Sequence, residues 1–114
     1  MRIEVKGRNV AVKDEYRDRL GRKLDKVSRQ VSALADCEVE LWEERNPSIR
    51  DSQVAEVTLH LKGVTLRASE RSEDMEHSIN LVAEDLARQV KRHRDKRRKR
   101  RDAMRRAEGA PPLP

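Results

Sequence analysis

An apolar stripe that stops abruptly at Val90 constrains this chain more than any other feature. From residue 72 to residue 90, apolar side chains recur at the spacing of one buried helix face, at Met75, Ile79, Val82, Leu86 and Val90. Beyond Val90 the stripe gives way to a run of basic residues, which has no apolar face to pack on a core. We therefore predict one long helix from Ser72, its N-cap, to about Arg106, packed through its first half and projecting through its second.

The positive charge is concentrated in the projecting half. Residues 88–106 contain 12 basic and 2 acidic residues, a net charge of 12 − 2 = +10, out of 27 Lys and Arg in the whole chain. The rest of the chain has 15 basic and 19 acidic residues, a net of 15 − 19 = −4. The sequence thus carries a directed basic arm, which favours a polyanionic partner; a solvated tail is the alternative.

Alternation of apolar and polar residues predicts four strands. They are expected over residues 2–6, 37–42, 56–61 and 64–69. Gly7 to Asn9 is predicted to be a turn, residues 45–52 a loop that includes Pro47, and Lys62-Gly63 the turn of a hairpin.

Between the first two strands the period becomes helical. Residues 14–31 place five apolar side chains on one face, at Tyr16, Leu20, Leu24, Val27 and Val31, and Asp14 is the expected cap. The element order β-α-β-β-β-α predicts an α+β sandwich, in which two helices cover one face of a mostly antiparallel four-stranded sheet.

This order divides the chain into three parts. We predict an α+β domain over residues 1–92, a basic helical extension over 93–107, and a proline-rich, non-helical tail or linker start over 108–114. The first residues lack the apolar run of a signal peptide, and no apolar run is long enough to cross a bilayer. Together with the single cysteine, Cys37, this favours a cytoplasmic protein without membrane contact.

The basic residues are sorted to one flank of each predicted helix. On the first helix this flank consists of Arg19, Arg22, Lys26 and Arg29. On the second it consists of Arg88, Arg92, Lys96 and Lys99. We expect the two flanks to form one continuous positive surface, and the opposite sheet face to be acidic through Glu38, Glu40 and Glu56. A phosphate backbone would then be attracted to the helix side only.

Other chemistries find little support. His60, His77 and His93 are far apart, which argues against a metal site, and Cys37 is expected to be a small buried residue without a neighbouring base. The scarcity of aromatic residues argues against base stacking, and Trp42 is expected to be a partly exposed packing residue. We therefore predict no catalytic residue, metal, cofactor or small-molecule substrate.

Several segments resemble one known family. They are Gly7-Arg8-Asn9-Val10, then Leu20, Lys23, Leu24 and Lys26, then Leu66-Arg67-Ala68-Ser69-Glu70, Asp74-Met75, Ile79, Leu81-Val82, Leu86 and Arg88-Gln89-Val90-Lys91-Arg92-His93 with Lys96. Over about residues 2–98 the chain resembles the ribosome-binding domain of ribosome hibernation-promoting factors, the protein Y family. Glu76 and Asn80 depart from its pattern, where Tyr and Asp are usual.

The resemblance implies a fold similar to double-stranded RNA-binding domains and a non-enzymatic role. Members bind the small ribosomal subunit between head and body, over the tRNA and mRNA sites, and hold the ribosome idle under stress or in stationary phase. It implies that ribosomal RNA is contacted by Lys23, Lys26, Arg88, Lys91, Arg92 and Lys96. The helix flanks add Arg19, Arg22, Arg29 and Lys99. Longer members carry a C-terminal dimerisation domain, so a dimer is expected only if such a domain is missing from this chain.

Two other functions fit the same charge pattern. One is a general module for structured RNA, such as an RNA chaperone. The other is a protein adaptor whose basic helix docks on an acidic partner.

Overall fold

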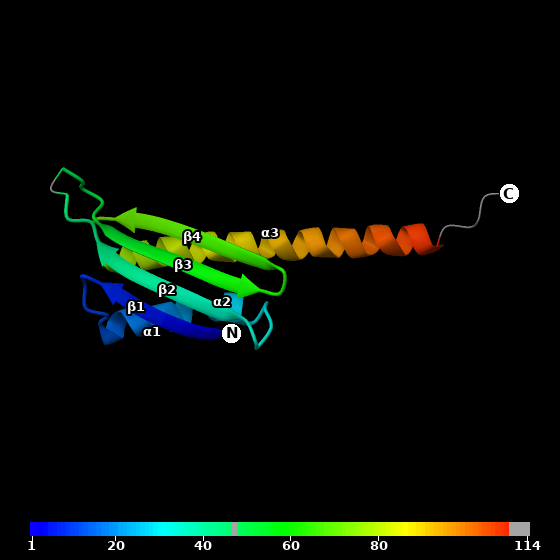
Figure 1. Cartoon of the computed structure of the whole chain (residues 1–114), viewed down its shortest axis with the longest axis horizontal. Coiled ribbons are helices and arrows are strands. Elements are labelled where there is room, and N and C mark those ends of the chain that lie inside the picture. The colour runs from blue at the N-terminus through cyan, green and yellow to red at the C-terminus, as the bar shows by residue number, and fades with distance from the viewer. Residues whose placement is uncertain (47, 110–114) are drawn as a thin grey trace.

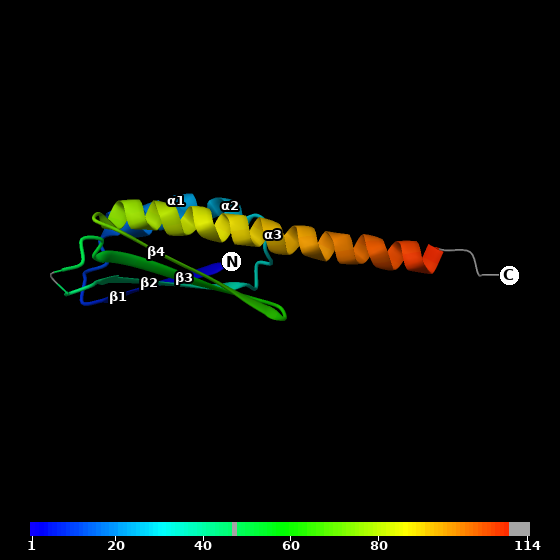
Figure 2. The same ribbon diagram turned by 90° about the horizontal axis from the view of Figure 1, so that it is seen from above.

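The structure is a computed structural model that describes residues 1–46 and 48–109. Within these residues the chain forms four strands and three helices, namely β1 Arg2–Arg8, α1 Asp14–Lys23, α2 Asp25–Ser28, β2 Asp36–Glu43, β3 Gln53–Leu61, β4 Val64–Ser72 and α3 Met75–Gly109. The strands make one layer and the helices make the other (Figure 2).

The sheet has the strand order β1-β2-β3-β4. β1 and β2 are parallel and are joined through α1 and α2, whereas the two other strand pairs are antiparallel. One row of core-facing positions crosses all four strands at Val5, Val39, Val57 and Ala68. The predicted α+β sandwich, with a mostly antiparallel sheet and its helices on one face, is confirmed.

The apolar stripe of α3 lies at the centre of the core. All five of its residues, from Met75 to Val90, are at most 3% exposed. They pack against Leu20, Leu24 and Val27 and against the inner face of the sheet. Burial of each aliphatic side chain contributes roughly 1.5–3 kcal/mol. The stripe therefore anchors α3 on the sheet and sets the direction of its basic half.

The basic half of α3 projects beyond the sheet (Figure 1). It makes the molecule long and narrow, with extents of 71 × 30 × 19 Å. The helix reaches Gly109, so Glu108 and Gly109 belong to α3 and not to the predicted non-helical tail. Pro111 disfavours helical backbone only at the residue before it, and nothing earlier stops the helix. The rest of that predicted tail, residues 110–114, lies outside the described residues.

The segment predicted as one helix over residues 14–31 forms two helices, which meet at Leu24. Leu24 is fully buried, with φ −86° and ψ −2°. The second helix ends at Ser28. The N-cap position belongs to Lys13, which makes no capping side-chain hydrogen bond. Asp14 is instead in the first turn, where the helix dipole favours a carboxylate.

The start of α3 also differs from the prediction. Ser72 is the last residue of β4, and the helix begins at Met75. The Ser72 Oγ accepts a hydrogen bond from the Asp74 N–H at 3.2 Å and lies 2.7 Å from the Ser78 Oγ. The Ser78 hydroxyl donates to the Gln53 carbonyl at 2.6 Å. Ser72 thus ties the start of α3 to the ends of β3 and β4 without capping the helix.

The turn predicted at residues 7–9 begins later, because β1 continues through Arg8. Gly7 is needed for close packing: an added Cβ would overlap the Val10 carbonyl oxygen. Asn9 has a positive φ of 61°, and its side chain exchanges two hydrogen bonds with the backbone of Glu43, at 2.8 and 2.9 Å. The glycine therefore marks a close approach within the strand, and the turn follows it.

The hairpin at Lys62-Gly63 is confirmed, with φ +80° at Gly63. The predicted loop after β2 is also found at residues 44–46 and 48–52, closed by a 2.7 Å hydrogen bond from the Glu44 N–H to the Ser52 carbonyl. Pro47, part of that prediction, lies outside the described residues.

Candidate nucleic-acid interface

The ten cationic residues predicted to bind RNA all lie on the helix side of the sheet. They belong to α1, α2, the residue that follows α2, and α3. Nine of them are exposed, and Arg19 is partly buried. No helix among the described residues combines the length and apolarity needed to span a bilayer.

Four of the ten predicted cations, from α1 and α2, line a groove between these two helices and α3, which we call the α1 groove. Its lining consists of Arg19, Arg22, Lys23, Lys26, Ala83, Glu84 and Ala87. The small side chains of Ala83 and Ala87 leave the space that makes the groove, of about 590 Å³. Lys23 and Lys26 therefore face an open channel and remain available to an anionic partner.

Two of the predicted cations of α3, Arg92 and Lys96, line a groove on the other flank of this helix, which we call the β4 groove. Its lining consists of Val64, Leu66, Asp85, Gln89, Arg92, His93 and Lys96. The Gln89 amide donates to the Arg67 carbonyl at 2.8 Å and holds this flank of α3 against β4. The structure thus divides the expected continuous surface into two grooves, with α3 as the ridge between them.

The carboxyl groups of Glu70 and Asp85 lie close together beside the β4 groove and reduce its positive charge. The pKa of Glu70 is raised, first by burial and then by the charge of Asp85 and a hydrogen bond to it, whereas the charge of Arg88 acts in the opposite direction. These carboxyl groups disfavour a phosphate next to them. Arg92 and Lys96, further along α3, are the better positions for one.

Arg19 is already engaged within the protein. Its guanidinium lies 3.2 Å from the Glu76 carboxylate and donates to the Asn80 side-chain oxygen at 3.3 Å. Arg19 therefore links α1 to α3, and we assign it to helix packing. Glu76 and Asn80 are the two positions that depart from the pattern of the resembled family.

A third groove, which we call the arginine groove, escaped the sequence prediction. On α3 it is lined by Val90, His93, Arg94, Arg97, Arg98 and Arg101. Its other walls are Gln30, Val31, Ser32, Leu61 and Lys62. The signal was present, because the arginines continue the helical spacing of the apolar stripe beyond Val90. The basic flank predicted for this helix lies on its outward face, away from this groove.

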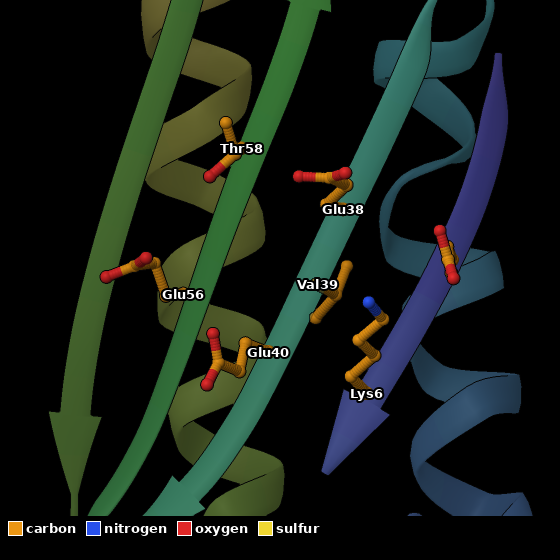
Figure 3. A pocket seen from close by; sticks show the side chains of 7 residues that line it. Lys6, Glu38, Val39, Glu40, Glu56 and Thr58 are labelled. Carbon is orange, nitrogen blue, oxygen red and sulfur yellow. The ribbon is translucent and has the colours of Figure 1, made fainter. Parts of the chain in front are cut away.

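The opposite face of the sheet has an acidic centre. Glu38, Glu40 and Glu56 extend from β2 and β3 around a shallow hollow, away from the helices (Figure 3). The register adds basic residues on the outer strands of the same face, at Arg2, Lys6, Arg8, Arg67 and Arg71. The expected acidic face is therefore a central stripe with basic edges, because the outer strands contribute cations that the prediction left out.

An ion pair ties the β1 edge to the stripe, because Arg8 lies 3.2 Å from Glu40. Within the centre of the sheet, the His60 ring nitrogen Nε2 lies 3.3 Å from the Glu38 carboxylate. The Arg8 guanidinium also lies over the ring of half-buried Trp42, 4.5 Å from its centroid. Trp42 is thus the partly exposed packing residue that was predicted.

The histidines and the cysteine of the described residues were predicted to have no catalytic or metal-binding role. In the described ranges, no three His, Cys, Asp or Glu side chains gather as metal ligands would. Cys37 is buried, as predicted, and burial raises the pKa of its thiol from 9.0 to about 11.

Comparison with known proteins identifies the family. The family model described as Sigma 54 modulation protein / S30EA ribosomal protein matches residues 3–98. The chain belongs to this family. The match covers the whole sandwich and the first turns of the projecting half of α3. The resemblance inferred from the sequence is thereby confirmed.

Two curated relatives are named ribosome hibernation promotion factor. The protein from Picosynechococcus sp. is 34% identical over 97 residues, which cover 84% of this chain and 50% of the relative. The protein from Staphylococcus aureus is 34% identical over 107 residues, which cover 90% of this chain and 53% of the relative. The chain therefore spans about half the length of the curated relatives it matches.

Two solved structures share the fold. The crystal structure of the Thermus thermophilus Protein Y N-terminal domain matches with a TM-score of 0.68 at 28% identity, covering 82% of this chain and 99% of that one. A ribosomal subunit interface protein from Coxiella burnetii matches with a TM-score of 0.70 at 18% identity, covering 83% of this chain and 99% of that one.

Proposed function

We propose that this chain is a ribosome hibernation factor that binds the small ribosomal subunit at its tRNA and mRNA decoding region and inhibits translation under stress or in stationary phase. One observation carries the proposal: exposed cations gather on the helix side of a sandwich whose sequence belongs to a ribosome-associated family. The relatives' names support hibernation as the outcome. A factor that acts on ribosomes works in the cytoplasm.

The mechanism we propose is occupancy. Phosphates of ribosomal RNA are neutralised by lysines and arginines, and this interaction supplies most of the affinity. The rigid sandwich then excludes tRNA and mRNA by its volume. The acidic stripe on the far face of the sheet disfavours a reversed orientation. Occupancy makes and breaks no covalent bond, so it requires neither a catalytic residue nor a cofactor.

The grooves divide the contacts we propose into three sets. Lys23 and Lys26 act from the α1 groove, and Arg92 and Lys96 act from the β4 groove. Helical periodicity places Arg88 and Lys91 on the solvent side of the ridge between them. A second tier of contacts consists of Arg22, Arg29 and Lys99. Arg19 is left out because Glu76 and Asn80 hold it.

Co-sedimentation with purified small subunits tests the proposal. If six to ten phosphates are engaged, affinity should fall by roughly three to five decades between 50 and 200 mM salt. Replacing Arg88, Lys91, Arg92 and Lys96 by Ala should abolish co-sedimentation and leave the circular dichroism spectrum unchanged.

A matched control removes four cations from the far face of the sheet, by replacing Arg2, Lys6, Arg67 and Arg71 by Ala. This control variant should still bind, because its changes lie on the side away from the helices. Equal loss in both variants, or a flat salt response, would refute the proposed interface.

The second candidate function is a general RNA-binding module or RNA chaperone. It rests on the large excess of cationic over aromatic residues in this sequence. Filter binding to duplex RNA, duplex DNA and intact small subunits separates the two. Hibernation predicts a strong preference for the assembled subunit, and a chaperone predicts comparable affinities.

A further inference from the structure

The helix face that packs α3 on the sheet continues past the end of the sheet as a row of arginines. Arg94, Arg97 and Arg101 follow Val90 at the i+4, i+7 and i+11 positions, which keeps them on one face of the helix. The core therefore gives way, along one unbroken helix face, to guanidinium groups that overhang the end of the sheet.

This face forms one wall of the arginine groove, whose volume is about 380 Å³. The groove has an apolar part, made by Val31, Leu61 and Val90, which also belong to or pack against the core. The basic part consists of Lys62, Arg94, Arg97, Arg98 and Arg101. The groove thus places an aliphatic surface directly beside several cations.

The arginines of this groove form no ion pair among residues 1–46 and 48–107, whose side chains the structure describes. No carboxylate of these residues lines the groove. Helical periodicity places Asp95 and Asp102 away from Arg94, Arg97 and Arg101 and beside Arg98 only, at its i−3 and i+4 positions. Guanidinium groups crowded on one face repel one another unless an anion neutralises them.

We infer that the arginine groove takes a single-stranded segment of RNA, with its phosphates on the arginines and one unstacked base against the aliphatic surface. The inference rests on the proposed function and adds a contact beyond the outward-facing residues. The groove-facing cations of α3 are all arginines, whereas Lys91, Lys96 and Lys99 lie elsewhere on the helix. Guanidinium binds phosphate in a bidentate manner and stacks on bases, which an ammonium group does not do.

The geometry favours a single strand over a duplex. A duplex buries its bases in the stack, and entry would require both backbones to fit into about 380 Å³. An unstacked base offers a flat face to the aliphatic surface and to the guanidinium planes. The guanidinium planes can thus stack on a base in a chain that has few aromatic residues to do so.

Two double variants test the inference. Arg97→Ala with Arg101→Ala empties part of the groove, and Arg100→Ala with Arg106→Ala removes the same charge from positions outside its lining. Affinity for a short fluorescent oligoribonucleotide, single-stranded or annealed to its complement, is measured by anisotropy. The groove variant should lose about tenfold or more for the single strand, the size of one stacked base with its phosphate contact, and the control variant much less.

Photo-crosslinking locates the base. An oligoribonucleotide that contains 4-thiouridine should crosslink to peptides that include residues 30–32 or 61–62, which form the walls opposite α3. Equal loss of affinity in the two double variants would overturn the inference, since charge alone would then explain binding. Competition by poly-glutamate as effective as competition by RNA would also overturn it, in favour of an acidic protein partner.

The two proposals fail in different ways. If the wild-type chain does not co-sediment with small subunits, the proposed function is wrong. If the wild type co-sediments and the groove variant binds subunits and single strands as well as its control does, only the groove assignment is wrong.

Discussion

The contact between Arg19 and Glu76 should stabilise the packing of α1 on α3 by an amount that a double-mutant cycle can measure. Arg19 and Glu76 lie 57 residues apart in the sequence, and their charged groups are 3.2 Å apart. The perturbation is Arg19→Ala, Glu76→Ala and the two together. The coupling free energy is the difference between the stability lost in the double variant and the sum of the stabilities lost in the two single variants.

Burial sets the expected magnitude. The two side chains are 28% and 33% exposed, so the pair lies between two limits. Exposed pairs contribute about 0–1 kcal/mol, and loss of one partner of a fully buried pair costs about 3–5 kcal/mol. Arg19 Nε is buried with no hydrogen-bond partner among the described residues, which reduces the net gain. We therefore expect a coupling of about 1–2 kcal/mol.

The pair between Arg29 and Asp25 calibrates the measurement. Its charged groups are closer, at 2.8 Å, but its side chains are 79% and 52% exposed. An exposed i,i+4 pair should give about 0.3–0.5 kcal/mol. The longer, half-buried contact should thus couple more strongly than the shorter, exposed one.

Urea unfolding followed by circular dichroism gives the free energy of unfolding of each variant. Arg17→Ala, at an exposed position of the same helix, controls for the loss of one arginine from α1. A coupling for Arg19 and Glu76 that is no larger than the coupling for Arg29 and Asp25 would show that burial does not outweigh distance in this pair.

Three further predictions concern single residues. Gly7→Ala should destabilise the fold by roughly 2–4 kcal/mol, because the new Cβ would overlap the Val10 carbonyl oxygen; urea unfolding should show a lower midpoint, and an unchanged midpoint would contradict the close packing. Burial raises the pKa of Cys37 from 9.0 to about 11, which lowers the fraction of reactive thiolate. At mildly alkaline pH this thiol should therefore react with a thiol reagent about 100-fold more slowly in the folded than in the unfolded chain. Equal rates in the two states would show that the thiol is accessible in the folded chain. A raised Glu70 pKa means that the folded state holds this proton more tightly, so the contribution of this group to stability is lost as pH rises. Glu70→Gln should therefore raise Tm at neutral pH but not in acid well below the usual pKa of 4.5. A gain in Tm that is independent of pH would exclude both the burial of the ionised carboxylate and its repulsion from Asp85 as the cause.

Local patterns were sufficient to predict much of this fold. The period-two strands, the stripe from Met75 to Val90 and the projecting basic half of α3 are found in the structure. Each depends on backbone geometry that repeats every two or 3.6 residues. Apart from the break of the first predicted helix at Leu24, the errors lie at element ends, where a single residue can serve more than one purpose. Gly7 serves close packing within a strand, and Ser72 serves a buried hydroxyl pair.

The partners of Arg19 show where sequence reasoning reached its limit. On the helical wheel Arg19 belongs to the exposed basic flank, and Glu76 and Asn80 are only departures from a family pattern. The packing of α1 on α3 brings the three together. No periodicity within either helix contains this information, because the contact depends on how the two helices cross.

The strands, the buried face of α3 and the concentration of charge beyond Val90 can all be predicted from the sequence, since they follow from spacing along a single element. The division of the cations between two flanks of α3, the basic edges of the acidic stripe and the groove formed by arginines beyond the core arise only when the elements pack together. A groove is made by the surfaces of several elements at once. Its shape depends on where the sheet ends relative to the helix, and that relation is settled by packing of residues far apart in the chain.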